Sequence, residues 1–536
     1  MSALAASGQL AVLPIVLPLL MGSVLVVVGR RAPRLAAALG FASLLAVLVC
    51  AAALCARTAD GNVLAYLTGN WPAPFGISLA VDRLAALMLL VTALVALASQ
   101  LAAAGGLARR TPMFSALLQF QVAGLNGAFL TADLFNLFVF FEVLLAASYA
   151  LLLAAADRGS VRAGVHYVAI NLFGSTLFLM AAAMLYGVLG TLNMADLSLR
   201  VATVAAGDRV LVEAAGLMLL VAFAIKAAAL PLGFWLPGTY AAAAPPVAAL
   251  FAIMTKVGLY AIARVATLLY GTGGYAATYG PILVGVGLAT LAFAALAGLA
   301  ARDLRTLAAW MITGSAGTLL ALIGVGTPES LGAAMFYLPH TTFAAAALML
   351  VAGLLSQARG GWLADRFELG ARPAPATLLG TLFVVTALAS AGLPPFSGFV
   401  AKAILLDSVL GTAGAAAIWC VVLGASLAWV IALSRAGSLV FWKSASVAAG
   451  PLLPPPHGPS NASRHGGSAD AAALPGSLAA IALLVVAGLA IVALASPLSA
   501  HFARAGAQLA APAAYREAVL AQQPVQRAAA AGSAAR

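Results

Sequence analysis

Five ionisable side chains lie within long apolar stretches of the sequence: Glu142, Lys226, Lys256, His340 and Lys402. A lysine near the centre of a bilayer costs roughly 2.5–3.5 kcal/mol on insertion scales. A leucine would pack at such a position without that cost, so packing alone does not explain three lysines and a glutamate. Titratable groups inside membrane segments are typical of ion and proton pathways. We therefore interpret these five residues as a route for ions or protons through the membrane.

The chemistry of these groups suits proton transfer. A carboxylate close to a lysine stabilises the charged ammonium, so moving Glu142 toward or away from Lys226 would change how readily the lysine releases its proton. Histidine accepts a proton on one ring nitrogen and donates from the other, which suits His340 to a relay. The alternative interpretation is structural, with a static ion pair for the glutamate and a hydrogen-bonded packing role for the histidine. The number of such groups in one chain favours the relay.

Other polar residues lie closer to the ends of apolar stretches. Arg305 and Ser315 are candidate accessory residues for the second half of the chain, and Asp407, near the end of its stretch, is a weaker candidate. Asp133 and the pair Asp82–Arg83 lie at the boundaries of apolar stretches. For these boundary residues a structural anchor is the simpler interpretation.

The composition identifies the elements that must hold these residues. Of 536 residues, 64% are hydrophobic and only 8% are charged, whereas about a quarter of a soluble domain is charged. The mean hydropathy is +1.08. A transmembrane helix needs about 20 mostly apolar residues. About fourteen such windows predict an all-α polytopic membrane protein: 9–29, 34–55, 78–100, 113–132, 134–156, 163–188, 210–232, 245–270, 276–300, 304–324, 331–355, 375–410, 413–442 and 474–496.

The net charge of +12 predicts an orientation in the membrane rather than a nucleic-acid partner. With the N-terminus outside, the loops on one side carry 15 basic residues and the opposite loops carry 3, namely Arg57, Arg200 and Arg209. The positive-inside rule places the arginine-rich side in the cytoplasm. The first apolar run lacks a basic segment before it, so we expect a retained span rather than a signal peptide. The 15 are Arg30, Arg31, Arg34, Arg109, Arg110, Arg158, Arg162, Arg302, Arg305, Arg359, Arg366, Arg372, Arg435, Lys443 and Arg464.

Prolines predict two helices that break inside the membrane. Pro231 and Pro237 follow Lys226, and Pro394 and Pro395 precede Lys402. A proline removes a backbone donor, and freed carbonyls at membrane depth must face protein or a wet cavity. Paired broken helices point to inverted repeats with a site at mid-membrane.

This symmetry predicts the following division of the chain: helices 1–3 in 1–112, a first repeat in 113–272, a second repeat in 273–443, a Pro/Gly/Ser-rich cytoplasmic linker in 444–473, helix 14 in 474–496 and an Ala-rich tail, disordered or marginally helical, in 497–536.

Several chemistries are disfavoured by the sequence. It contains no Gly-Lys dipeptide and hence no P-loop for nucleotide phosphates. Cys50, Cys55 and Cys420 lie in apolar runs without metal or redox spacing, so we expect inert thiols. His457 and His465 are eight residues apart in the linker without partner acids or thiols. We expect no metal site, no bound cofactor and no enzymatic reaction.

Four motifs resemble the antiporter-like subunits of respiratory complex I and of Mrp-type (Pha/Mnh) multisubunit cation/proton antiporters: TADLFNLFVFFEVLLAASYALL, AIKAAALPLGFWLPGTY, PPVAALFAIMTKVGLYAIAR and ASAGLPPFSGFVAKAIL. The resemblance covers about residues 71–443 and is greatest to the D-type subunit of Mrp antiporters. It implies that Glu142 corresponds to the family's fifth-helix glutamate, Lys226 and Lys256 to its seventh- and eighth-helix lysines, and Lys402 to the lysine of the broken twelfth helix. His340 corresponds to the histidine of the central hydrophilic axis.

The sequence also departs from the family pattern. Many complex I relatives have Asp and His where this chain has Gly238 and Tyr240, and a central lysine where it has Ala344. A direct lysine-to-lysine transfer through the middle is therefore doubtful. His340 with water would have to complete the route.

The resulting hypothesis is a component of a larger antiporter complex in the bacterial inner membrane. It would move protons along the buried Glu/Lys/His chain in exchange for Na⁺ or K⁺, with other membrane subunits as partners. One alternative is a proton-pumping subunit of complex I or of a membrane-bound hydrogenase. A more distant alternative is an autonomous solute carrier that grips its substrate with the broken helices.

Overall fold

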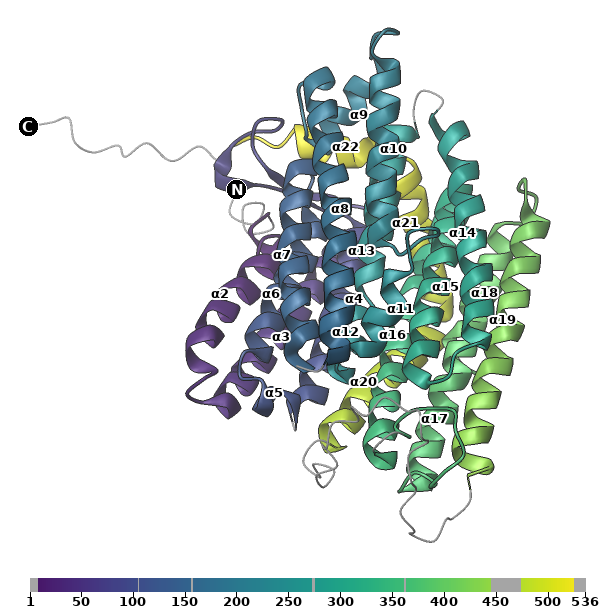
Figure 1. The fold of residues 1–536 in the computed structure, drawn as a ribbon. Coiled ribbons are helices and arrows are strands. Elements are labelled where there is room, and N and C mark those ends of the chain that lie inside the picture. Colours follow the sequence, from purple (N-terminus) through teal and green to yellow (C-terminus); the bar gives the residue numbers. More distant parts are fainter. Residues whose placement is uncertain are drawn as a thin grey trace, which may run out of the picture.

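The computed structural model describes residues 8–104, 106–155, 158–271, 275–360, 363–444 and 474–524, which form a bundle of long helices (Figure 1). Ten described helices are long and apolar enough to cross a membrane, and three more apolar helices are shorter. A helix satisfies all its backbone groups internally, which is why apolar segments in lipid fold this way. The expected linker with His457 and His465 lies outside the described residues, apart from Ser444.

The main helices are α2 (Leu13–Val28), α3 (Pro33–Thr58), α4 (Arg83–Ala104), α5 (Leu107–Arg110), α6 (Phe114–Leu130), α7 (Leu134–Leu152), α8 (Arg158–Leu189), α9 (Met194–Ala202), α10 (Arg209–Lys226), α11 (Trp235–Ala242), α12 (Pro245–Phe251), α13 (Met254–Val265), α14 (Tyr275–Leu299), α15 (Leu304–Val325), α16 (Pro328–Arg359), α17 (Ala376–Ala391), α18 (Ser397–Ser408), α19 (Ala415–Gly437), α20 (Leu474–Ala493), α21 (Ala495–Ala510) and α22 (Ala513–Leu520). Strands β1 (Leu64–Leu67) and β2 (Ser78–Val81) form an antiparallel pair.

The connections gather at two ends of the bundle. Figure 1 shows α5 and the start of α17 at the bottom, and α9 and α22 at the top. The bottom, which we call the arginine-rich end, joins loops from distant parts of the chain. Thr111 donates to the carbonyl of Ala154 there, and Arg435 donates to that of Ala301.

Two short backbone joints have the same construction. In each, an aspartate caps one helix and forms an isolated antiparallel β-bridge with a residue that follows the next helix. Asp133, which caps α7, bridges to Asn193 after α8, and Asp303, which caps α15, bridges to Arg366 after α16. Asp133 caps α7 and Asp303 caps α15, each by accepting from the backbone N–H three residues later. The hydrogen bonds beside each pair also correspond: Leu134 N–H to Leu192 O and Met194 N–H to Ala132 O in the first, Leu304 N–H to Asp365 O and Phe367 N–H to Arg302 O in the second.

The two predicted helix interruptions are present. The first runs from the end of α10 at Lys226 to the start of α11, with Pro231 inside it. The second separates α17 from α18 and contains Pro394 and Pro395. Pro237 was expected at a break but lies in the first turn of α11, where a proline removes no helical hydrogen bond.

A third interruption separates α12 from α13 at Ala252 and Ile253. The sequence there contains neither proline nor glycine, so its apolar pattern predicted one continuous span.

The described part of the Ala-rich tail is helical, which was one of the two expected alternatives, and it packs against the bundle. Residues 495–520 form α21 and α22, and Phe502, Leu509 and Tyr515 are buried. Glycines explain the close packing, because a Cβ at Gly332 of α16 would lie 2.8 Å from the carbonyl oxygen of Phe502. Small residues let helix backbones approach in this way.

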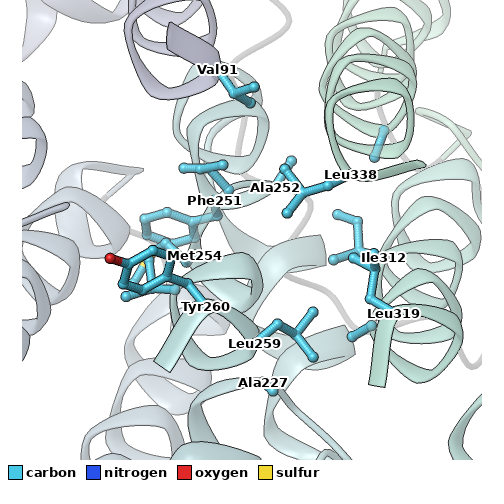
Figure 2. Packing of buried hydrophobic residues seen from close by; sticks show 14 of the residues in the cluster. Val91, Ala227, Phe251, Ala252, Met254, Leu259, Tyr260, Ile312, Leu319 and Leu338 are labelled. Carbon is cyan, nitrogen blue, oxygen red and sulfur yellow. The ribbon is translucent and has the colours of Figure 1, made fainter. Parts of the chain in front are cut away.

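The apolar core surrounds the helix that carries Lys256. Figure 2 shows Val91 of α4, Ile312 of α15 and Leu338 of α16 directed toward the region of α12 and α13. An 18-residue window within Pro245–Leu269 is completely buried, so no lipid-facing side remains on that part of the helix. Its lysine therefore cannot extend to a membrane surface.

A candidate proton pathway

Glu142 and Lys226 are joined through Ser175 rather than by direct contact. The Ser175 hydroxyl on α8 donates to Glu142 Oε1 at 2.5 Å, and Lys226 Nζ lies 3.4 Å from the same hydroxyl. Among the described residues no ion pair links the carboxylate to the ammonium directly. The half-buried glutamate lies on α7, and the lysine is 8% exposed. The predicted pair is thus present as a hydroxyl-bridged pair.

Lys226 ends α10 at the first interruption. Its ammonium also lies 3.5 Å from the carbonyl of Asn171 and 5.8 Å from the centre of the Phe141 ring. The carbonyl of Ile225, near the helix end, accepts from Trp235 Nε1 at 3.0 Å and from the backbone N–H of Ala228 at 3.1 Å. The lysine is therefore held beside polar backbone at the break, as the proline pattern predicted.

Lys256 has a single polar partner among the described residues. It is fully buried, and its Nζ donates to Ser315 Oγ of α15 at 2.9 Å. Ser315 in turn donates to the carbonyl of Ile312. The accessory residue expected for the second half thus contacts the lysine of the first half.

A cavity continues the route from Ser315. It is lined by Ser315, His340 and Lys402, with Thr318, Tyr337, Thr341, Ser390 and Ser426 among its other polar residues. The cavity offers about 30 Å³ to the centres of water molecules. That volume holds about two to three waters, since one needs about 10–15 Å³ by this measure.

His340 and Lys402 lie at the second interruption. His340 Nδ1 is 2.9 Å from Ser397 Oγ in the first turn of α18. Lys402 Nζ donates to the carbonyl of Ala391 at 2.7 Å and to Ser426 Oγ at 2.8 Å. Because Ala391 ends α17, the ammonium lies at the negative end of a helix dipole, where a cation is favoured.

Among the described residues, Lys226 and Lys256 do not line a common cavity. The small cavity beside Lys226, which we call the apolar interval, does not have Lys256 in its lining. The small cavity on the Lys226 side is lined mainly by apolar side chains, including Trp235, Met254 and Val257. It offers only about 10 Å³ to water centres, the lower limit for one molecule. The five predicted residues therefore form two groups, one around Lys226 and one from Lys256 to Lys402, with an apolar interval between them.

The remaining candidates lie away from this line. Arg305 forms an ion pair with Asp365 at 2.9 Å, and the exposed Asp407 does not line the cavity. Asp133 caps α7. Among the described residues no group of three or more His, Cys, Asp or Glu side chains could hold a metal ion.

Asp82 belongs to a buried cluster that the sequence did not predict. Its carboxylate forms two hydrogen bonds of 2.7 and 2.8 Å with Arg264 of α13. The Arg264 guanidinium also lies over the rings of Tyr260 and Tyr515, 5.3 and 4.7 Å from their centres. The neighbouring Arg83 donates to the carbonyl of Ala59.

The serines that link the lysines were also not singled out, apart from Ser315. Ser175 contacts both Glu142 and Lys226, and Ser397 and Ser426 contact one titratable group each. Serine is frequent in membrane helices, so only its spatial position distinguishes these three from the others.

The fold and this line of buried groups define a polytopic membrane protein of the ion-translocating type. The chain belongs to the NADH:quinone oxidoreductase/Mrp antiporter transmembrane family, whose model matches residues 131–428.

Similar proteins come from several bacteria. The chain is 43% identical over 470 residues to the D-type subunit of a probable K(+)/H(+) antiporter of Rhizobium meliloti, covering 81% of this chain and 87% of that protein. It is 38% identical over 337 residues to the D-type subunit of a Na(+)/H(+) antiporter of Bacillus subtilis, covering 62% and 67% of the two chains.

Solved structures agree with these relatives. A chain of the Mrp complex from Dietzia superposes with a TM-score of 0.83 at 31% identity, covering 96% of this chain and 99% of that one. A chain of respiratory complex I from Thermus thermophilus gives a TM-score of 0.73 at 22% identity, covering 93% and 99%, which shows a shared fold.

Proposed function

We propose that this chain is the D-type membrane subunit of a multisubunit antiporter that exchanges protons for Na⁺ or K⁺. The relatives that support this assignment are named as antiporter subunits and match most of the chain. The observation that carries the ion-translocating role is the cavity that brings Ser315, the partner of Lys256, together with His340 and Lys402. The chain transports ions and catalyses no reaction of its own.

The proton is proposed to start in the hydroxyl-bridged pair. While Glu142 and Lys226 share Ser175, the carboxylate stabilises the ammonium. Separating them removes that stabilisation, and the proton moves toward Lys256. At an effective dielectric constant near 20, a change of a few ångströms in such a pair is worth about 1–2 kcal/mol, or about one pKa unit. That energy is sufficient to change which group holds the proton.

The second half of the route uses the hydrated cavity. From Lys256 the proton passes through Ser315 and water to His340, whose Nδ1 contacts Ser397. It then reaches Lys402 and leaves beside the second interruption. Each of these transfers is reversible. The transmembrane gradient, which supplies about 2.3 kcal/mol per charge per 100 mV, drives net proton movement in the reverse order, from Lys402 toward Lys226 and the cytoplasm.

The apolar interval is proposed to prevent a leak. A continuous hydrated path would let protons cross without exchange. The interval between Lys226 and Lys256, lined by Trp235, Met254 and Val257, interrupts it. We propose that rearrangement of the first broken helix closes this interval only when a cation is exchanged.

Location and division of the chain follow the same proposal. We place the protein in the bacterial inner membrane with its arginine-rich end in the cytoplasm and its N-terminus outside. The two repeats are proposed to span 113–272 and 273–443. The matching joints at Asp133 and Asp303 support this division, because each begins the second helix of its repeat.

A proton-pumping role in a redox complex is the second candidate. The similarity to complex I supports the common fold, but its 22% identity is well below the 43% to the antiporter protein of Rhizobium meliloti. We therefore favour the antiporter.

The test is transport by the intact complex. The chain is co-expressed with its neighbouring membrane subunits in cells lacking other antiporters, and everted vesicles are energised to form a pH gradient. Addition of Na⁺ or K⁺ is expected to dissipate the gradient. Proton pumping that depends on an electron donor, without any response to either cation, would contradict the proposal.

A further inference from the structure

Three aromatic side chains form a column beside the first interruption. The rings of Tyr167 and Trp235 stack with centres 5.0 Å apart, and Trp235 meets Tyr240 edge to face at 6.1 Å. Both tyrosines are fully buried, and the tryptophan is 3% exposed. We call Tyr167, Trp235 and Tyr240 the aromatic column. Apolar packing explains three rings, but it does not explain two tyrosine hydroxyls where phenylalanine would suffice.

One end of the column faces Lys226. Tyr167 and Trp235 line the same small cavity as the lysine. The Tyr167 hydroxyl lies 2.9 Å from Ser148 Oγ, and the Ser148 hydroxyl donates to the carbonyl of Leu145. A hydroxyl pair of this kind can accept a proton on one side and release one on the other.

The other end of the column carries a hydroxyl without a partner. Tyr240 Oη is buried, and no described residue forms a hydrogen bond with it. Buried polar atoms in proteins nearly always have a partner, either protein or water. An unpaired hydroxyl at this position is the arrangement expected of a group that exchanges hydrogen bonds during function.

Tyr240 lies on the side of the arginine-rich end. It is in α11, one turn before the connection to α12, where Ala244 and Pro245 are only half-buried. That connection is fixed near the end of α4, because Ser99 donates to the carbonyl of Pro246. The column thus extends from Lys226 toward this end of the bundle.

The Trp235 ring contacts the rings of both tyrosines and is tied to the broken helix. Its indole N–H donates to the carbonyl of Ile225, the residue before Lys226. A rearrangement of the interruption that changes the position of Lys226 must also break or redirect this hydrogen bond. The hydrogen bonding of the Trp235 ring is therefore coupled to the position of the lysine.

We propose that Lys226 exchanges its proton with the arginine-rich end of the membrane along the aromatic column, with the Tyr167 and Tyr240 hydroxyls as relay groups and Trp235 as the gate between them. The inference rests on the proposed antiport function and names the access route for its first lysine. Each hydroxyl accepts a proton on its oxygen while releasing its own, so no net charge remains on either tyrosine. Trp235 is a positioning residue, because it acts by separating or connecting the relay groups.

The first experiment removes single hydroxyls while retaining the rings. Tyr240→Phe and Tyr167→Phe are introduced into the complete antiporter complex, with Tyr149→Phe as a matched control. Tyr149 packs edge to face on Tyr167 at 5.0 Å but is half-buried and outside the column. Cation-dependent proton flux is measured as a function of pH, together with the amount of assembled complex.

The expected result is at least a tenfold loss of flux in both column variants, with normal assembly, and a change of less than twofold in Tyr149→Phe. Tyr240→His restores a group that relays protons and is expected to recover flux with an altered pH profile, which a purely structural role would not produce. Near-normal flux in both column variants would overturn the inference while leaving the proposed function intact. An unmodified complex without antiport would instead defeat the proposed function.

A second experiment tests the direction of access without measuring transport. Tyr240→Cys is made in a complex in which Cys50, Cys55 and Cys420 are replaced by alanine. A small, membrane-impermeant thiol reagent is applied to vesicles of either orientation. Labelling is expected only from the arginine-rich side. Labelling only from the opposite side, or no labelling in assembled complex from either side, would contradict the proposed route.

Discussion

Each titratable group on the proposed route contacts the hydroxyl of a serine residue. Ser175 bridges Glu142 and Lys226, and serines also meet Lys256, His340 and Lys402. A hydroxyl both donates and accepts, so it can stay bonded whether its neighbour is charged or neutral. A serine can therefore form a hydrogen bond with its neighbour in both protonation states, whereas a second fixed charge would favour only one of them.

Removing either member of the bridged pair should abolish exchange. Glu142→Gln keeps the size of the side chain but removes the charge, and Lys226→Ala removes the proton carrier. Both variants are expected to assemble and to lose cation-dependent proton flux in vesicles, the measurement that checks them. Near-normal flux in either one would defeat the assignment of the first half of the route.

Asp133→Asn provides the contrast. Burial raises the pKa of Asp133, while the backbone N–H groups at the start of α7 act in the opposite direction. Asparagine is an equally good N-terminal cap, so this variant should retain most of its flux. A loss as large as that of Glu142→Gln would show that Asp133 takes part in transport.

Ser175→Ala tests the bridge itself. Without the hydroxyl the carboxylate and ammonium lose their common partner, and we expect a several-fold lower flux with a shifted pH profile. Ser175→Thr retains a hydroxyl and should be closer to the unmodified protein. Equal flux in the alanine and threonine variants would show that the bridge is dispensable.

At the scale of elements, the two interruptions place lysines where helices end. The sequence predicted both breaks, because proline cannot continue a helix. It placed Pro237 wrongly, since a proline in a first turn has the same sequence signature as one at a break. The division between α12 and α13 was missed, because neither proline nor glycine marks Ala252 and Ile253.

Gly392 provides a test of the second interruption. It has φ of +79°, and a Cβ there would lie 2.8 Å from Lys402 Nζ. Gly392→Ala should therefore displace the ammonium and reduce antiport at least tenfold. Gly411→Ala is the matched control, since its φ is +77° but no heavy atom lies within 4 Å of the added Cβ.

The two glycine variants share the strain of a left-handed backbone, about 1–2 kcal/mol. Flux per assembled complex should therefore differ between them, while their stabilities should be similar. If Gly392→Ala and Gly411→Ala transported equally well, the position of Lys402 at the break would be unimportant.

At the scale of the whole molecule, the C-terminal helices connect parts that are far apart in the sequence. Arg264 of α13 contacts both Asp82, before α4, and Tyr515 of α22. Arg264 lies two turns from Lys256 on the same helix, so this cluster fixes the helix that carries the central lysine. The sequence indicated the spans and the titratable residues because their periodicity and cost in lipid are local properties. It did not indicate this cluster, because partners 182 residues apart leave no local pattern.

Asp82→Asn should destabilise the complex. Burial alone would raise the pKa of Asp82, but the charge and hydrogen bonds of Arg264 outweigh it and hold the pKa below its ordinary value. The stabilisation is therefore present at neutral pH and lost only as the pH falls through this lowered pKa. Breaking a buried ion pair costs about 3–5 kcal/mol.

The measurement is the unfolding temperature of the purified complex, which should fall. Glu368→Gln is the control, because it breaks only the exposed pair with Arg366, and exposed pairs contribute about 0–1 kcal/mol. Equal unfolding temperatures for Asp82→Asn and the unmodified complex would contradict the role of the cluster.

The central claim is that Lys256, His340 and Lys402 are joined by water within the protein. An experimental map of the intact complex, at a resolution that shows ordered water, tests it most directly. We predict water in the cavity between Ser315, His340 and Lys402, with His340 and Lys402 facing it and Lys256 connected to it through Ser315. A dry cavity, or titratable groups turned toward lipid acyl chains, would contradict the account.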